Sequence, residues 1–234
     1  MIGYPDVRDA IMKRSLIAAL LVSNALFAQE GARPALLTAG EAPPLPVQNI
    51  AGGQVLLEAT VDRTGRIIGI TTLRTTPSFE ELVTETMRGW RFSPAAGERP
   101  DGTFGPIDSR VLVAALFRPP TLMDGPAVGE LPRDTVVASE QVPFPVAAPL
   151  PPFPPTALAG GVVILEVEIG RDGSVARARV VRAGPGGFDA ASTDTIRQWK
   201  FRPARLRGTP VASVAYVIFG FSQPIIITEP NRRR

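Results

Sequence analysis

Two stretches of the chain alternate between apolar and polar residues in the way that predicts half-buried β-hairpins. In VVILEVEI (162–169) every second residue is apolar, which predicts a strand with one face on a core. The turn GRDG (170–173) and the returning strand SVARARVV (174–181) follow, with glycine where a turn favours a positive φ. VLLEATV, DRTG and RIIGITTL repeat this pattern over residues 55–73. We therefore expect two similar hairpins.

Each hairpin is followed by apolar residues at helical spacing. The first stripe contains Phe79, Leu82, Val83, Thr86, Met87 and Trp90, and the second contains Phe188, Ala191, Thr195, Ile196 and Trp199. Ser78 and Glu81 have the spacing of a capping box that would begin the first helix. A closing strand is expected at 107–117 and at 211–221. The predicted fold class is α+β, with two repeated β-β-α-β units, each a small antiparallel three-stranded sheet with one helix packed on a face.

The two units are similar in sequence as well as in pattern. When residues 51–78 are aligned with 159–186, and 79–95 with 188–204, 18 of the 45 positions are identical. This similarity predicts an internal duplication. Both copies contain the motif W-x-F-x-P-A, which we interpret as a structural core motif because a buried aromatic ring stabilises a small domain strongly. Its residues are Trp90, Phe92 and Pro94 in the first copy and Trp199, Phe201 and Pro203 in the second.

The distribution of proline and apolar residues suggests the domain boundaries. Residues 43–117 form the first predicted domain and residues 151–223 the second. The predicted remaining segments are a signal peptide (1–28), a flexible segment (29–42), a Pro-rich linker (118–150) and a C-terminal tail (224–234). Within the linker, DTVVASEQV could instead form a short edge strand or dock onto one repeat.

The N-terminal prediction depends on a basic start at Lys13 and Arg14, an apolar run from 15 to 28 and small residues at its end. The run is shorter than the ~20 residues that usually span a bilayer. Met12 could be the true start, and an uncleaved membrane anchor or a buried helix is the alternative interpretation.

Composition excludes several kinds of chemistry. The chain has no Cys and no His, which removes disulfides, the usual zinc sites and the commonest general base near neutral pH. A net charge of +3 is too small to suggest nucleic-acid binding. Glu166 and Glu168 lie two residues apart, without a partner base, and we interpret them as a solvated strand face. We therefore predict that the protein is not an enzyme and has no cofactor or metal.

The combined pattern resembles the TonB C-terminal domain family. The resemblance depends on the hairpin, the helix ending in W-[KR]-F-x-P-A, the segment Gly208-Thr209-Pro210-Val211 and the approach PPFPPTALAGG, and it covers about 43–117 and 151–223. It implies a periplasmic protein that binds the extended segment of a partner, such as a TonB-dependent receptor, at an exposed sheet edge. The family's anchor helix usually carries a His for coupling to the inner-membrane motor, and this chain has none.

Three functions are compatible with these features. The first is a secreted envelope module that binds partner strands by edge augmentation, within TonB-type transport. The second is a membrane-anchored energy transducer to outer-membrane receptors, if residues 15–28 are retained. The third is a structural protein that self-associates or binds cell-wall polymer through a basic face, which would contain Arg177, Arg179, Arg197, Lys200, Arg202, Arg205 and Arg207.

The last strand of the second copy is the predicted docking edge. Its β-branched and aromatic residues suit strand pairing, whereas Asp108 and Arg110 guard the start of the corresponding strand in the first copy. The predicted partner-binding residues are Ser213, Ala215, Val217 and Phe219. The first copy would then serve mainly as a spacer or scaffold.

Overall fold

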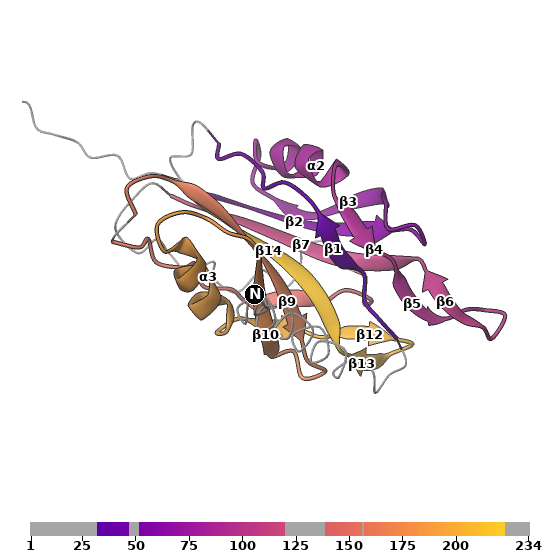
Figure 1. Ribbon diagram of the computed structural model, residues 1–234. Helices are drawn as coiled ribbons and strands as arrows, with labels where there is room; N and C mark the ends of the chain where they lie inside the picture. The colour runs from indigo at the N-terminus through magenta and orange to yellow at the C-terminus, as the bar shows by residue number, and fades with distance from the viewer. Residues whose placement is uncertain (1–31, 47–51, 120–138, 156, 223–234) are drawn as a thin grey trace, which may run out of the picture.

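The computed structural model describes residues 32–46, 52–119, 139–155 and 157–222. Within these residues the protein is α+β, as predicted, with two helices and a larger number of strands (Figure 1). The predicted signal peptide, most of the predicted linker and the predicted tail lie outside the described residues. The segment DTVVA also lies outside them.

One six-stranded sheet forms the centre of the molecule. Its strand order is β10-β9-β14-β7-β2-β3. The strands are β2 (Gly53–Val61), β3 (Ile67–Thr75), β7 (Ser109–Arg118), β9 (Gly161–Ile169), β10 (Val175–Arg182) and β14 (Ser213–Phe221). The hairpins β2–β3 and β9–β10 lie where the alternating pattern predicts them.

The two closing strands lie side by side in the middle of this sheet. β14 pairs with β7 in parallel, from Leu112 opposite Ala215 to Arg118 opposite Phe221. Each strand also pairs antiparallel with the first strand of its own hairpin, β7 with β2 and β14 with β9. The expectation of two separate three-stranded sheets is therefore wrong, because the third strand of each repeat joins the two halves.

The two helices cover opposite faces of the sheet. α2 (Glu80–Arg88) lies above it in Figure 1 and α3 (Phe188–Ile196) below it. Because the central strands β7 and β14 lie between these two layers, both faces of each strand are buried. The result is a three-layer arrangement with a core on each side of the sheet, which we call the α2-side core and the α3-side core.

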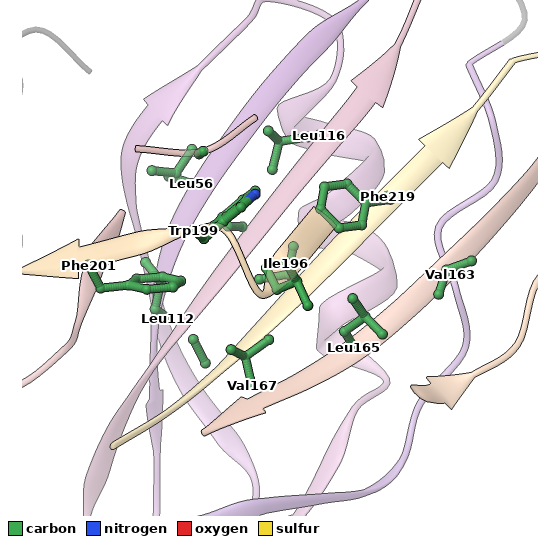
Figure 2. Close-up of a cluster of buried hydrophobic side chains, with 14 of the residues drawn as sticks. Leu56, Leu112, Leu116, Val163, Leu165, Val167, Ile196, Trp199, Phe201 and Phe219 are labelled. Carbon is green, nitrogen blue, oxygen red and sulfur yellow. The ribbon is translucent and has the colours of Figure 1, made fainter. Parts of the chain in front are cut away.

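Residues from both repeats form the α3-side core (Figure 2). Trp199, Ile196 and Phe219 belong to the second repeat and are almost completely buried. Leu56 and Leu112 of the first repeat belong to the same cluster. The second repeat therefore uses side chains of the first to complete its hydrophobic core.

The α2-side core shows the reciprocal arrangement. Trp90 and Phe92 of the first repeat pack against Tyr216 of the second, with ring centroids 6.1 and 5.7 Å away. Ile164 and Ile218 of the second repeat are also in this cluster. Neither repeat has a core made only of its own residues.

A proline-containing leading segment precedes each repeat and packs onto the sheet. In the first, residues 32–46, β1 (Leu36–Ala39) pairs with β4 (Arg91–Ser93). In the second, residues 139–155, β8 (Phe144–Ala147) pairs with β11 (Lys200–Arg202). The expected flexible segment and linker are therefore wrong for residues 32–42 and 139–150, which are ordered parts of the fold.

Two short hairpins lie at one end of the sheet (Figure 1). β5 (Ala95–Glu98) pairs with β6 (Phe104–Ile107), and β12 (Ala204–Leu206) pairs with β13 (Thr209–Val211). Each hairpin connects the W-x-F-x-P-A motif to the closing strand of its repeat. The loop of the first hairpin, residues 99–103, is longer than that of the second, residues 207–208.

The repeated tryptophans hold the leading segments in place. The indole N–H of Trp90 donates to the Glu41 carbonyl at 3.0 Å, and that of Trp199 donates to the Pro149 carbonyl at 2.9 Å. Both rings are fully buried. Each tryptophan therefore lies in a core and also fixes the backbone that precedes its own repeat.

The phenylalanine of each motif is positioned by a hairpin glycine. The amide of Phe92 donates to Gly65 and the amide of Phe201 to Gly173, both at 2.9 Å. Gly65 has a φ of 81° and Gly173 a φ of 79°, and a Cβ there would lie within 2 Å of the phenylalanine carbonyl oxygen. Only glycine can occupy these positions, because both the backbone angle and the available space exclude a side chain.

The predicted capping box at Ser78 and Glu81 is wrong. α2 begins after Phe79, and its N-terminus has no side-chain cap. Ser78 has a φ of 75°, a left-handed conformation outside the usual range of an N-cap residue. The helix is instead fixed by its buried residues Val83 and Met87.

We expect the two repeats to unfold as one cooperative unit, because both cores are shared. The variants Trp90→Phe and Trp199→Phe each retain one of the two tryptophans of the chain as a local fluorescent reporter. In urea, the fluorescence transition of each variant should coincide with its own far-UV circular dichroism transition. Two separated transitions in either variant would contradict the shared core.

Candidate partner-binding surfaces

The structure places the predicted docking strand in the interior of the sheet. Ala215 and Val217 are fully buried and Phe219 is almost so, and all three belong to the α3-side core. Ser213 stands at the start of β14. The strand pairs with β9 on one side and β7 on the other. The expectation of an exposed edge at Ser213, Ala215, Val217 and Phe219 is therefore corrected: the first repeat occupies that edge.

The outer edges of the six-stranded sheet are β3 and β10. In the described part of the chain each is paired on one side only, β3 with β2 and β10 with β9. Isolated bridges join Arg66 to Arg91 and Ser174 to Lys200, just before β3 and β10 begin. They leave the rest of each outer edge unpaired within the described residues. Among the described residues, the outer backbone ladder of each strand is therefore long enough to accept an extended peptide.

The two outer edges differ in charge. Alignment of the repeats places Gly69 and Thr71 of β3 where β10 has Arg177 and Arg179. Arg179 forms a bidentate pair with Glu166, with N–O distances of 3.0 Å. Charged side chains along an edge oppose the approach of another strand because they must be desolvated. β3 is therefore the less protected edge.

A buried glutamate in each repeat holds the leading segment of the other. In the first repeat, Glu58 is 3% exposed and accepts from the Ser139 amide at 2.9 Å. Its second oxygen accepts from Arg110. Ser139 begins the second leading segment, so this carboxylate joins the two repeats.

In the second repeat the equivalent residue, Glu166, is connected to the first leading segment through the hydroxyl of Tyr216. The hydroxyl of Tyr216 donates to Glu166 at 3.0 Å and accepts from the Leu37 amide at 2.6 Å. Leu37 belongs to the first leading segment. Arg179 neutralises the carboxylate from the strand edge. The pair Glu58 and Glu166 thus occupies equivalent positions in the repeats and connects each repeat to the other.

The prediction that Glu166 and Glu168 form a solvated face is wrong. Glu166 is 4% exposed and Glu168 7%. Both lie on the α2 side of β9, where Arg179 and Arg177 provide the opposite charge. The alternating pattern correctly placed both glutamates on the same face of β9. It could not show that the first leading segment covers that face.

The basic residues of the second repeat are distributed over several elements, and some of them are paired with acidic side chains. Arg177 and Arg179 lie on β10, Lys200 and Arg202 on β11, and Arg205 on β12. Arg197 pairs with Asp194 at the end of α3. This distribution does not support the alternative of a basic face for anionic polymers.

The described residues contain no group of three or more acidic side chains that could hold a metal ion. Within the same ranges, no helix is both long and apolar enough to cross a bilayer.

Tyr216 should make stability depend on alkaline pH. Burial raises the pKa of its phenol far above the usual range, and the neighbouring Glu166 carboxylate adds to the shift. The unfolded phenol ionises near pH 10, whereas the folded one stays neutral, so stability is unaffected below about pH 10 and falls by about 1.4 kcal/mol per pH unit above it.

The experiment compares wild type with Tyr216→Phe by urea unfolding at pH 8.5 and pH 11. The variant lacks the phenol, so its loss of stability between the two pH values should be smaller by about 1.4 kcal/mol. Groups that both proteins share cancel in this comparison. An equal loss in both proteins would mean that Tyr216 is ionised in the folded state.

Comparison with known proteins finds one family model that matches part of the chain. The family model described as "Gram-negative bacterial TonB protein C-terminal" matches residues 151–222, which span the second repeat from the end of its leading segment to the end of β14. No curated protein and no solved structure matches the chain. Residues 151–222 are therefore similar to the C-terminal domain of Gram-negative bacterial TonB proteins.

Proposed function

We propose that the chain is a periplasmic protein-binding module in which two TonB C-terminal-like units are fused through their closing strands. It binds an extended segment of an envelope protein, such as a TonB-dependent receptor, by strand addition to the outer edge of β3. The family match supports an interaction role in the envelope for residues 151–222, and the sequence similarity between the repeats extends this expectation to the first repeat. The choice of β3 as the binding edge follows from its outer position in the strand order of the sheet.

The main observation behind this proposal is that both closing strands are already paired along both of their backbone edges. β7 and β14 form backbone pairs on both sides, so a partner strand would have to break the centre of the sheet to reach either of them. The outer strands β3 and β10 are paired on one side only within the described residues. Strand addition there requires no such disruption.

The chemistry of the two edges favours β3. Ile68 on this strand is 63% exposed, and three threonines, at 71, 72 and 75, provide β-branched side chains that suit pairing. β10 instead carries three arginines within eight residues. The first repeat is then the binding unit, and the second repeat stabilises it by forming the other half of the shared sheet.

The alternative functions make different demands on the chain. Energy transduction requires that residues 15–28 remain as a membrane anchor, and N-terminal sequencing of the mature protein distinguishes an anchored from a cleaved form. Self-association would use the same free edges, with a second copy as the partner. Sedimentation of the purified protein separates that case from binding of another protein.

The variant Thr71→Arg tests the β3 edge. Because Thr71 lies opposite Glu58 as Arg179 lies opposite Glu166, an arginine there has a carboxylate to pair with and the fold should be retained. Gln198→Arg, at the exposed end of α3, adds the same charge elsewhere.

Wild type and both variants are immobilised and exposed to an outer-membrane extract. The protein that wild type retains is identified by mass spectrometry, and its affinity is then measured with each purified variant. Thr71→Arg should weaken binding roughly tenfold, about 1.4 kcal/mol, and Gln198→Arg less than twofold. Equal binding by Thr71→Arg would move the site away from β3, and the absence of any retained protein would refute the proposed function.

A further inference from the structure

A cleft opens where the two central strands begin. β7 starts at Ser109 and β14 at Ser213, but their mutual pairing starts only at Leu112 and Ala215. On their other sides these first residues are paired with β2 and β9. The inner backbone edges of residues 109–111 and 213–214 therefore have no ladder partner among the described residues.

The space between these strand ends has a volume of about 550 Å³. The start of the first leading segment and the β12–β13 hairpin provide much of its wall, including Pro34, Leu206 and Val211. This volume lies within the range of ordinary ligand sites. The wall is largely apolar, which suits the side chains of a peptide better than a free inorganic ion.

Two hydroxyl groups in this cleft lack partners. The Oγ atoms of Ser109 and Ser213 are buried and form no hydrogen bond within the described part of the chain. The two serines stand at the start of β7 and β14, and strand alternation places Ser109 on the α2 side of the sheet, with Val111, and Ser213 on the α3 side, with Ala215. A buried hydroxyl without a partner is costly, and such groups often mark the position of a ligand.

The charge of the lining is positive. Four arginines, Arg33, Arg110, Arg171 and Arg205, face one acidic residue, Asp108. Arg110 also pairs with Glu58, so the positive charge most relevant to a ligand lies on the two walls, at Arg33 and Arg205. A ligand with carboxylates would complement this charge.

We propose that this cleft binds an extended acidic peptide segment of a partner protein, at a site separate from the β3 edge. The unpaired backbone groups of β7 and β14 pair with the peptide backbone. Arg33 and Arg205 contact its carboxylates. This inference goes beyond the proposed function, because it adds a second point of contact with its own charge preference.

The test uses a fluorescein-labelled octapeptide of sequence Val-Glu-Val-Thr-Val-Glu-Val-Thr and measures fluorescence anisotropy with the full chain. A peptide with lysine in place of glutamate is the comparison probe. The acidic peptide should bind at least tenfold more tightly than the basic one. Arg33→Glu and Arg205→Glu, on opposite walls, should each weaken the acidic peptide at least fivefold.

Two controls separate this site from other surfaces. Arg197→Glu on the exposed end of α3 reverses a charge outside the cleft and should change affinity less than twofold. Gln198→Arg, which adds a positive charge at an exposed position outside the cleft and away from β3, should also change peptide affinity less than twofold. Circular dichroism verifies that each variant is folded.

Three results would overturn the proposal. These are equal binding of the two peptides, no binding of the acidic peptide, and an Arg197→Glu effect as large as that of Arg205→Glu. If Thr71→Arg abolished peptide binding while the cleft variants did not, the peptide would be bound at the β3 edge, which supports the proposed function and refutes this inference. If the chain retained no envelope protein but the cleft variants weakened the acidic peptide as expected, the proposed function would fail and this inference would hold.

Discussion

The parallel pairing of β7 with β14 is the constraint on which the rest of the molecule depends. It joins the third strand of each repeat in the middle of one sheet and gives both strands two buried faces. Once the strands are joined, α2 and α3 cover opposite faces, and each core draws side chains from both repeats. The carboxylates of Glu58 and Glu166 then link each repeat to the leading segment of the other. These features are reciprocal, as expected for two similar units that meet through equivalent strands.

This arrangement changes where a partner can bind. A domain with a free closing strand offers that strand as an edge, but here each closing strand protects the other. The remaining edges are the second strands of the two hairpins, and they have diverged in charge, with arginines on β10 where β3 has Gly69 and Thr71. The repeats are therefore equivalent in architecture but not in the surfaces that they present.

The sequence predicted the hairpins and the helices, because these depend on local periodicity and on large apolar side chains. It misplaced β14, although the signal was present. VLVAALF in β7 and VAYVIFGF in β14 are almost continuously apolar, which is typical of strands covered on both faces, and a long apolar edge would be prone to aggregation. The burial of Glu166 and Glu168 could not be predicted, because the segment that covers them is distant in the sequence. The same holds for the cleft, since its walls come from both repeats.

The central pairing also has a consequence for the order in which the chain can fold. Leu112 meets Ala215, which is 103 residues later in the sequence. Closing so long a loop costs entropy before the new contacts compensate, and proteins rich in such distant contacts fold slowly. Until β14 has formed, β7 has one exposed apolar edge, and the first repeat is vulnerable to aggregation during that interval. A cell that makes this protein therefore has to protect the first repeat until synthesis of the second is complete.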